Sequence, residues 1–208
     1  LFAFYFSSLF AQADFTALKI TPNQPKQNAT LSFEYNQAYS SLIRKGNVTA
    51  AVYLFSKNGP KVLEPVLEKK GSVYKGTVML DSNTSAIAFL FSIKDEKDIN
   101  GGKGYVVALY GDNNEPLKTY YATAADIYGG GMGEYLLGIS NNKEKAFDML
   151  DAAIKTDPTL KRNPNIMRSY FNFLGRVKKE KGKSLVAEEL EKLLSFSDLS
   201  EEEYNNIA

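Results

Sequence analysis

The segment Asp95–Asn100 (DEKDIN) gathers four oxygen-bearing side chains into six positions. Carboxylate and amide oxygens are the ligands that Ca²⁺ prefers, which makes this segment a candidate calcium loop. Ca²⁺ requires six to eight oxygens, however, and Lys97 would repel it, while Ile99 breaks the EF-hand spacing. The pattern therefore favours a solvated loop, in which Asp98→Ala or Asn100→Ala should change stability by only about half a kcal/mol.

A second acidic stretch, Asp112–Glu115 (DNNE), has the same two interpretations, a calcium site or a solvated turn, and the solvated turn is favoured. Two glycine clusters, Gly101–Gly104 and Gly129–Gly133, lack the spacing of a phosphate loop and the parallel strand–helix–strand context of a dinucleotide site. We interpret the first cluster as a flexible turn and the second as a hinge between two parts of the chain.

Three residue types are missing altogether: the chain contains no Cys, no His and no Trp. Their absence excludes thiol chemistry, an imidazole base and a zinc site of the usual ligands. Carboxylates, lysines and tyrosines are left for catalysis, and no spacing selects a catalytic pair among the 24 acidic residues. We therefore predict a protein that is not an enzyme, with no catalytic, cofactor-binding or metal-binding residue and no cofactor. A net charge of +1 gives no reason to expect nucleic-acid binding.

Two further features could mark a surface site. Sequons for N-glycosylation occur at Asn28, Asn47 and Asn83, each at a predicted turn or strand edge. The 13 Tyr and 13 Phe residues could line a sugar-binding face, but most fall at predicted core positions, so core packing is favoured.

The first thirteen residues have the pattern of an export signal. Leu1–Phe10 is an apolar run too short to span a bilayer as a helix, and Ala11-Gln12-Ala13 matches a small-x-small cleavage site. We expect a signal peptide over 1–13, truncated at its start, a mature chain from Asp14 without a membrane span, and a periplasmic or secreted location. A buried first strand or helix is the alternative.

Residues 14–121 have all-β patterning. Ala86–Ile93 is apolar on both faces except at Ser92, which predicts a strand at the centre of a sheet, with Ile87, Phe89 and Phe91 pointing between two sheets. The other expected strands lie at Leu18–Ile20, Leu31–Tyr35, Val48–Ser56, Val62–Lys70 (ambiguous, an edge strand because of Pro65), Tyr74–Leu80, Gly104–Tyr110 and Leu117–Tyr121. About seven short strands without a helix predict an immunoglobulin-like antiparallel β-sandwich; a small barrel is the alternative.

Residues 122–208 change to helical periodicity. Ala122–Tyr128 predicts a short helix, and Lys143–Thr156 a longer one, in which Asn141 and Glu144 resemble a capping box. Further helices are expected after the Asn163 cap, over Ser184–Phe196 and after Ser200. Helical hairpins of this size, together with the segment Lys145–Pro158, resemble tetratricopeptide repeats, although a plain helical bundle explains the pattern nearly as well.

Several segments together resemble a known arrangement: the signal ending in Ala-Gln-Ala, ADFTALKITPNQPKQNATLSFEYN, GTVMLDSNTSAIAFLFS and NGGKGYVVALYGDNNEPLKTYYATAADIY. They resemble the N-terminal region of exported, thioredoxin-like (TlpA-like) thiol–disulfide oxidoreductases of Bacteroidetes. That resemblance implies an immunoglobulin-like domain, then tetratricopeptide-like helices, then a thioredoxin-fold domain bearing Cys-x-x-Cys. Because this chain has no Cys, none of the family's redox residues is carried over.

We therefore expect a non-catalytic accessory or protein-interaction region that positions a downstream thioredoxin-fold domain or docks a partner protein. A carbohydrate- or surface-binding sandwich is the alternative function.

Overall fold

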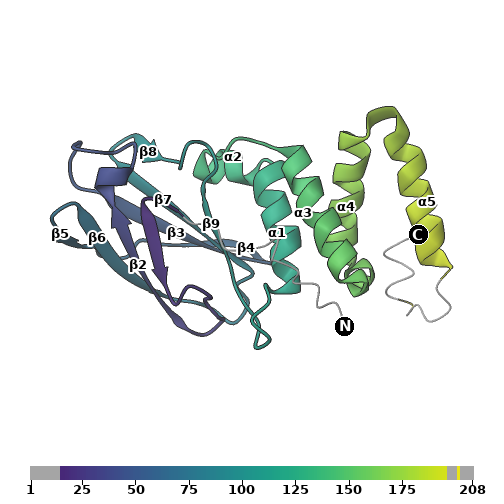
Figure 1. Cartoon of the computed structure of the whole chain (residues 1–208), viewed down its shortest axis with the longest axis horizontal. Coiled ribbons are helices and arrows are strands. Elements are labelled where there is room, and N and C mark those ends of the chain that lie inside the picture. Colours follow the sequence, from purple (N-terminus) through teal and green to yellow (C-terminus); the bar gives the residue numbers. More distant parts are fainter. Residues whose placement is uncertain (1–14, 196–200, 202–208) are drawn as a thin grey trace, which may run out of the picture.

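The computed structural model of the chain describes residues 15–195 and 201, with β-strands first and helices after them (Figure 1). The expected signal peptide and most of the segment after Ser200 lie outside the described residues. The strands are β1 (Leu18–Thr21), β2 (Thr30–Asn36), β3 (Thr49–Ser56), β4 (Gly59–Leu63), β5 (Glu68–Lys70), β6 (Val73–Met79), β7 (Ala86–Ile93), β8 (Glu96–Asp98) and β9 (Tyr105–Ala108). The helices are α1 (Lys118–Gly129), α2 (Met132–Leu137), α3 (Lys143–Thr156), α4 (Pro164–Val177) and α5 (Gly182–Leu194), with short 3-10 helices η1 (Gln37–Tyr39), η2 (Pro158–Arg162) and η3 (Lys179–Lys181).

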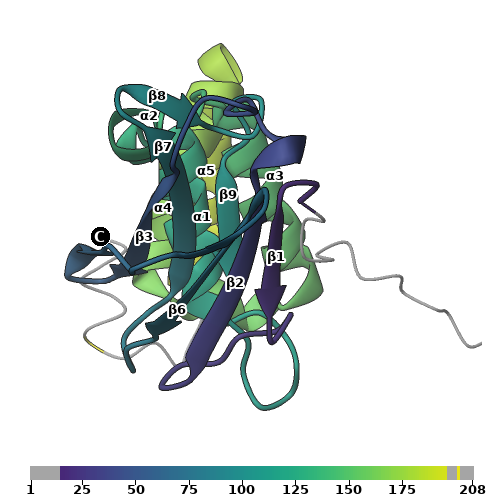
Figure 2. The ribbon, with the colours of Figure 1, turned by 90° about the vertical axis from the view of Figure 1, so that its left-hand side faces the viewer.

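The strands form two antiparallel sheets that pack face to face (Figure 2). The first sheet has the order β1-β2-β6-β5; the second has the order β4-β3-β7-β8, and β9 also pairs with β7. The prediction of antiparallel strands followed by helices is confirmed.

The ambiguous segment Val62–Lys70 is two edge strands, one on each sheet. Strand β4 pairs with β3 in the second sheet, and β5 pairs with β6 in the first. Between them the chain passes from one sheet to the other through Pro65, which has no N–H to give to a ladder. Pro65 therefore separates two edge strands, whereas the sequence predicts one edge strand across Val62–Lys70.

Strand β7 is buried on both faces. Ile87, Phe89 and Phe91 lie between the sheets, as predicted, and the rings of Phe33 and Phe89 meet edge to face with centroids 5.1 Å apart. Ala86, Ala88 and Leu90 lie on the opposite face and belong to a second core, shared with the helices. Because both faces are apolar, the sheet requires a cover on its outer side as well as its inner one.

Helices α1 and α2 cover the outer face of β7 (Figure 1). The predicted strand Leu117–Tyr121 is wrong, because α1 begins at Lys118. Adjacent Tyr120 and Tyr121 favour a strand by intrinsic propensity. In the fold, Tyr121, Ala122 and Ala125 recur at helical spacing in the core beneath α1, and this tertiary packing decides the conformation.

The remaining helices pack in succession: α3 on α1, α4 on α3, and α5 on α4. The predicted cap of α4 is confirmed, since the side chain of Asn163 accepts hydrogen bonds from the N–H groups of Asn165 and Ile166. The predicted cap of α3 is off by one residue. Asn142, not Asn141, adopts the capping conformation and accepts from the N–H of Lys145.

Two of the glycines expected to form a hinge, Gly129 and Gly133, are packing positions in the described structure. Gly129 ends α1 in contact with α3 and α4; a Cβ placed there would lie 2.7 Å from Ala146 Cβ and 2.6 Å from Phe173 Cε1. Gly133 is equally confined, because a Cβ there would lie 2.2 Å from the carbonyl oxygen of Ile127. These glycines let the helices approach closely. The division of the chain at 121 and 122 stays a prediction.

We expect Gly129→Ala to lower the free energy of unfolding by about 1–3 kcal/mol, because the added methyl group must displace a buried ring and the neighbouring helix. Gly175→Ala is the matched control: it lies within α4, and a Cβ there meets nothing within 4 Å. The control should raise stability by about 0.5–1 kcal/mol through helix propensity. Urea unfolding followed by circular dichroism measures both. Equal effects of the two substitutions would contradict the packing role.

Candidate functional site

The most tightly coordinated polar side chain among the described residues is Asp98, at the end of β8. Its Oδ2 accepts hydrogen bonds from the hydroxyls of Tyr35 at 2.8 Å and Tyr105 at 2.7 Å. Its Oδ1 accepts from Ser41 Oγ at 3.2 Å and from the backbone N–H of Asn100 at 3.1 Å. Asp98 is only 3% exposed, and it is the one charged residue buried among those the structure describes.

The two tyrosines are brought to Asp98 by the strand ladders. Tyr35 belongs to β2 of the first sheet, Tyr105 belongs to β9 of the second, and Asp98 lies opposite Phe91 in the β7–β8 ladder. The Tyr35 ring stacks on Phe91 with a centroid separation of 3.8 Å, and the Tyr105 ring meets Phe91 edge to face at 5.6 Å. These ring contacts with Phe91 hold both tyrosine rings in place, and both hydroxyls point at one carboxylate oxygen.

Burial sets the protonation of both tyrosines. Loss of solvent raises the pKa of Tyr35 and that of Tyr105 well above the ordinary value, and the neighbouring Asp98 adds to the rise in each. Both hydroxyls therefore stay protonated and act as donors. The carboxylate joins the two sheets through hydrogen bonds, and its acceptor positions are occupied by these protein donors.

The expectation that Asp98 belongs to a solvated loop is therefore wrong, whereas Asn100 lies half-buried in the turn that follows β8. The β8 backbone turns Asp98 inward, and Asn100 adopts a φ of +52° while its side-chain amide donates to the carbonyl of Gly104 at 3.0 Å. The other acids of the segment point elsewhere: Asp95 is exposed, and Glu96 pairs with Lys45. Within the described residues no group of three acidic side chains could hold a metal ion.

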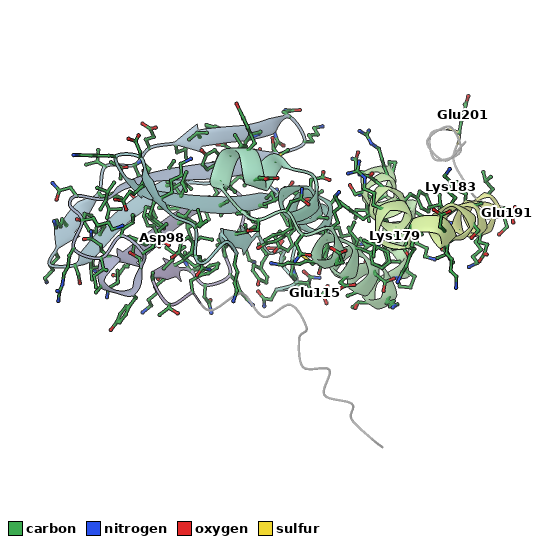
Figure 3. All side chains as sticks on the ribbon, turned by 90° about the horizontal axis from the view of Figure 1, so that it is seen from above. Asp98, Glu115, Lys179, Lys183, Glu191 and Glu201 are labelled. Atoms are coloured by element: carbon green, nitrogen blue, oxygen red, sulfur yellow. The ribbon has the colours of Figure 1, made fainter. Side chains whose placement is uncertain are left out.

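The second acidic stretch is a turn at the surface. Asp112 pairs with Lys26 at 2.9 Å, and Asn113 donates to Glu115 at 2.7 Å. The turn Gly101–Gly104 packs against the segment after α2, since a Cβ on Gly104 would lie 2.3 Å from Ile139 and the N–H of Ser140 donates to the carbonyl of Gly102. The hydrogen bonds of Asp98 given above include no donor from Asp112–Glu115. Figure 3 shows labelled charged side chains on both the β and the helical parts.

The three sequon asparagines, Asn28, Asn47 and Asn83, are all exposed. Most aromatic rings, by contrast, lie in the two cores, as predicted. Among the described aromatics, two are largely exposed: Tyr39 on η1 and Tyr135 on α2. They belong to different elements and do not stack on each other.

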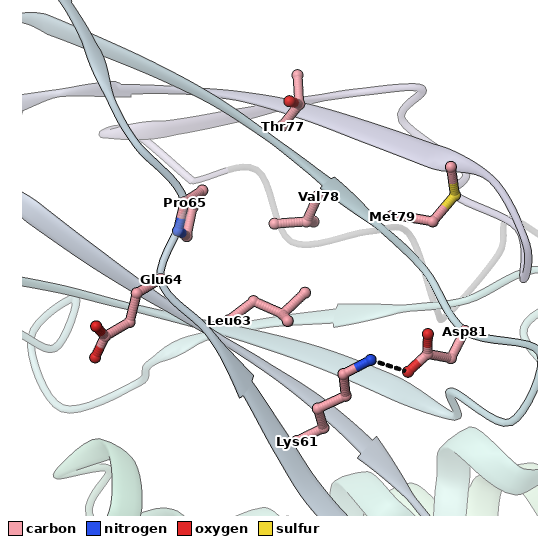
Figure 4. Close-up of a pocket in the computed structure, with 8 residues that line it drawn as sticks. All are labelled: Lys61, Leu63, Glu64, Pro65, Thr77, Val78, Met79 and Asp81. Carbon is pink, nitrogen blue, oxygen red and sulfur yellow. Dashed lines mark hydrogen bonds and ion pairs between the residues drawn. The ribbon is translucent and has the colours of Figure 1, made fainter.

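A shallow groove of about 400 Å³ opens at the side of the sandwich, between β4 and β6 (Figure 4). Leu63 and Val78 line it between the sheets, Thr77 and Met79 line it from β6, and the Lys61–Asp81 ion pair of 2.9 Å lies at one end. Three exposed apolar side chains lie on or next to the strands and the connection that border the groove. Val66 is 95% exposed, Met79 60% and Val62 46%.

Comparison with known proteins does not assign the chain to a family: no family model, no curated protein and no solved structure matches it. In the part of the chain that the structure describes, no helix is both long enough and apolar enough to cross a membrane.

Sequence reasoning missed both features. Nothing in DEKDIN distinguishes the inward carboxylate from its exposed neighbours, because the partners of Asp98 come from strands 63 and 7 residues away. The groove had one usable signal, Pro65, which interrupts the edge segment.

We expect Asp98→Ala to lower the free energy of unfolding by at least about 2 kcal/mol. Two buried hydroxyls lose their acceptor, and each unpaired group costs about 1–3 kcal/mol. Asp95→Ala, three residues away and exposed, is the control and should stay within about 0.5 kcal/mol of wild type. Thermal and urea melts measure both variants. A wild-type melt for Asp98→Ala would show that the carboxylate does not hold the sheets together.

We also expect the protein to lose stability in alkali. The pKa values of Tyr35 and Tyr105 are raised by folding, and burial raises the pKa of Tyr128 to about 12. A raised pKa contributes its full stabilisation below the unfolded value, about 10 for tyrosine, and loses it as pH rises further. Urea unfolding at about pH 8 and about pH 11 should show lower stability at the higher pH. Unchanged stability would mean that these hydroxyls are accessible to water.

Proposed function

We propose that this chain is the non-catalytic accessory region of an exported protein, and that it holds a downstream domain or a docked partner at a fixed position relative to the β part. The observation that carries this proposal is the core shared by sheet and helices. It extends from Ala88 on β7, through Ala125 of α1 and Phe173 of α4, to Leu193 of α5.

A continuous core makes an elongated body without a loose joint. The rings of Phe147 on α3 and Tyr170 on α4 stack with centroids 5.5 Å apart. Lys161 of η2 pairs with Glu189 of α5 at 2.8 Å, with both side chains largely shielded. Side-chain packing of this kind resists bending, because interiors are close-packed and deform little.

We propose further that the β part is an immunoglobulin-like sandwich and that the helices are tetratricopeptide-like. Two antiparallel sheets with a chain that passes from β4 to β5 support the first, and successive helix pairs α3–α4 and α4–α5 support the second. The resemblance to TlpA-like proteins makes a thioredoxin-fold domain the proposed cargo. Any thiol chemistry would belong to that domain, since this chain has no Cys. Export rests on the sequence pattern of residues 1–13.

The spacer role can be tested by measuring a distance across the molecule. Because the chain has no Cys, spin labels can be placed at Lys57→Cys, in the β3–β4 turn, and Glu191→Cys, on α5. Pulsed electron resonance should give one narrow distance distribution. Lys183→Cys with Glu191→Cys, both on α5, supplies the width that the labels alone produce.

A distribution for the long pair as narrow as that of the control pair is the expected outcome. A broad or multiple distribution would mean that the helical part moves relative to the sheets, and that the region does not hold a downstream domain or partner at a fixed position.

A further inference from the structure

The groove beside β6 contains an unpaired strand edge. In the β2–β6 ladder the N–H of Gln37 donates to the carbonyl of Ser72, and the N–H of Leu80 donates to the carbonyl of Ala29. Residues of an antiparallel strand alternate in the side to which their N–H and C=O groups point. The backbone groups of Thr77 and Met79 therefore point away from β2, toward the groove.

Strand β5 covers only the first half of that edge. It pairs with Val73 and Lys75 and ends there, because beyond Glu68 the chain leaves for β4 through Pro65. Among the described residues, Thr77 and Met79 have no strand beside them and no backbone hydrogen-bond partner on that side. The groove is thus the continuation of the β5 position, left empty.

The walls of the groove match an extended polypeptide chain. Leu63 and Val78 present apolar surface between the sheets, and Met79 presents apolar surface outside them. The Lys61–Asp81 pair neutralises two of the three charges in the lining and leaves Glu64 without an ion-pair partner among the described residues. The groove therefore favours an occupant that has backbone donors and acceptors at strand spacing, apolar side chains at alternate positions and one basic side chain.

We propose that the groove binds an extended segment of a partner protein by strand addition to the edge of β6. About four to five residues of the partner, an apolar strand with one Lys or Arg, hydrogen-bond to Thr77 and Met79. Its inward side chains contact Leu63 and Val78, and its basic side chain pairs with Glu64. Main-chain hydrogen bonds supply affinity, and the alternate side chains and the charge supply selectivity.

The test uses the whole chain and a panel of capped seven-residue peptides with Val at alternate positions and one Arg, or one Glu, among intervening Thr residues. Amide chemical shifts of the isotope-labelled protein report both the site and the affinity. Binding of the Arg peptides should change the amide chemical shifts of Thr77 and Met79. N-methylation of the bound peptide backbone should weaken binding about tenfold or more, because it removes the donors that a strand requires.

Glu64→Lys should weaken the Arg peptides by about tenfold and favour the Glu peptides, since it reverses the unpaired charge. Glu64 is exposed, so the variant should keep the fold. Glu191→Lys makes the same change of charge on α5, far from the groove, and should leave peptide binding unchanged.

Four outcomes would overturn the proposal, and the first three concern the peptides: no shift at about 1 mM peptide, equal binding of the N-methylated peptide, or shifts centred elsewhere. Protection of the same amides by concentration-dependent association without peptide would identify a second copy of the chain as the occupant, and would equally overturn it. None of these outcomes depends on the rigidity measured with spin labels, so this inference and the spacer role can fail separately.

Discussion

A strand that is apolar on both faces must be covered on both sides, and β7 imposes that requirement on the whole molecule. Its aromatic face, with Phe89 and Phe91, is covered by the first sheet, whereas its face of small residues, with Ala86 and Ala88, is covered by α1 and α2. At about 25 cal/mol per Å² of apolar surface, leaving either face in water would be a large cost compared with typical domain stability. Sandwich and helices are therefore joined at the strand that both need.

Small side chains determine how closely the helices approach. Alanines on β7 meet alanines on α1, and Gly129 and Gly133 remove the Cβ atoms that would separate the helices. On the other face large rings fill the space between the sheets, and Asp98 joins the sheets where Tyr35 and Tyr105 would otherwise bring two hydroxyls into the core unpaired. Each face of β7 thus has its own packing solution, and the proposed spacer role depends on both.

The sequence was most informative where local pattern and tertiary environment agree. The apolar residues on both faces of Ala86–Ile93 predicted that β7 is a central strand, and Asn163 before Pro164 predicted the start of α4. Both predictions succeed because strand burial and helix capping depend on residues that are neighbours in the sequence. The sequence was misleading where residues far away in the chain determine the conformation or the burial of a segment. Tyr120 and Tyr121 favour a strand by propensity, but packing against β7 makes this segment a helix. Asp98 has the sequence pattern of a solvated acid, but two strands from elsewhere in the chain place tyrosine hydroxyls beside it. The unpaired edge of β6 depends on where β5 ends, which sequence periodicity does not register.

The central claim is that sheet and helices form one cooperative unit through β7. Native-state hydrogen exchange across a denaturant series measures it most directly, because it assigns an opening free energy to each amide. The account predicts that amides of β7, α1 and α3 merge into a single opening with the free energy of global unfolding. Exchange of α1 and α3 through a separate opening of much lower free energy, with β7 still protected, would contradict it.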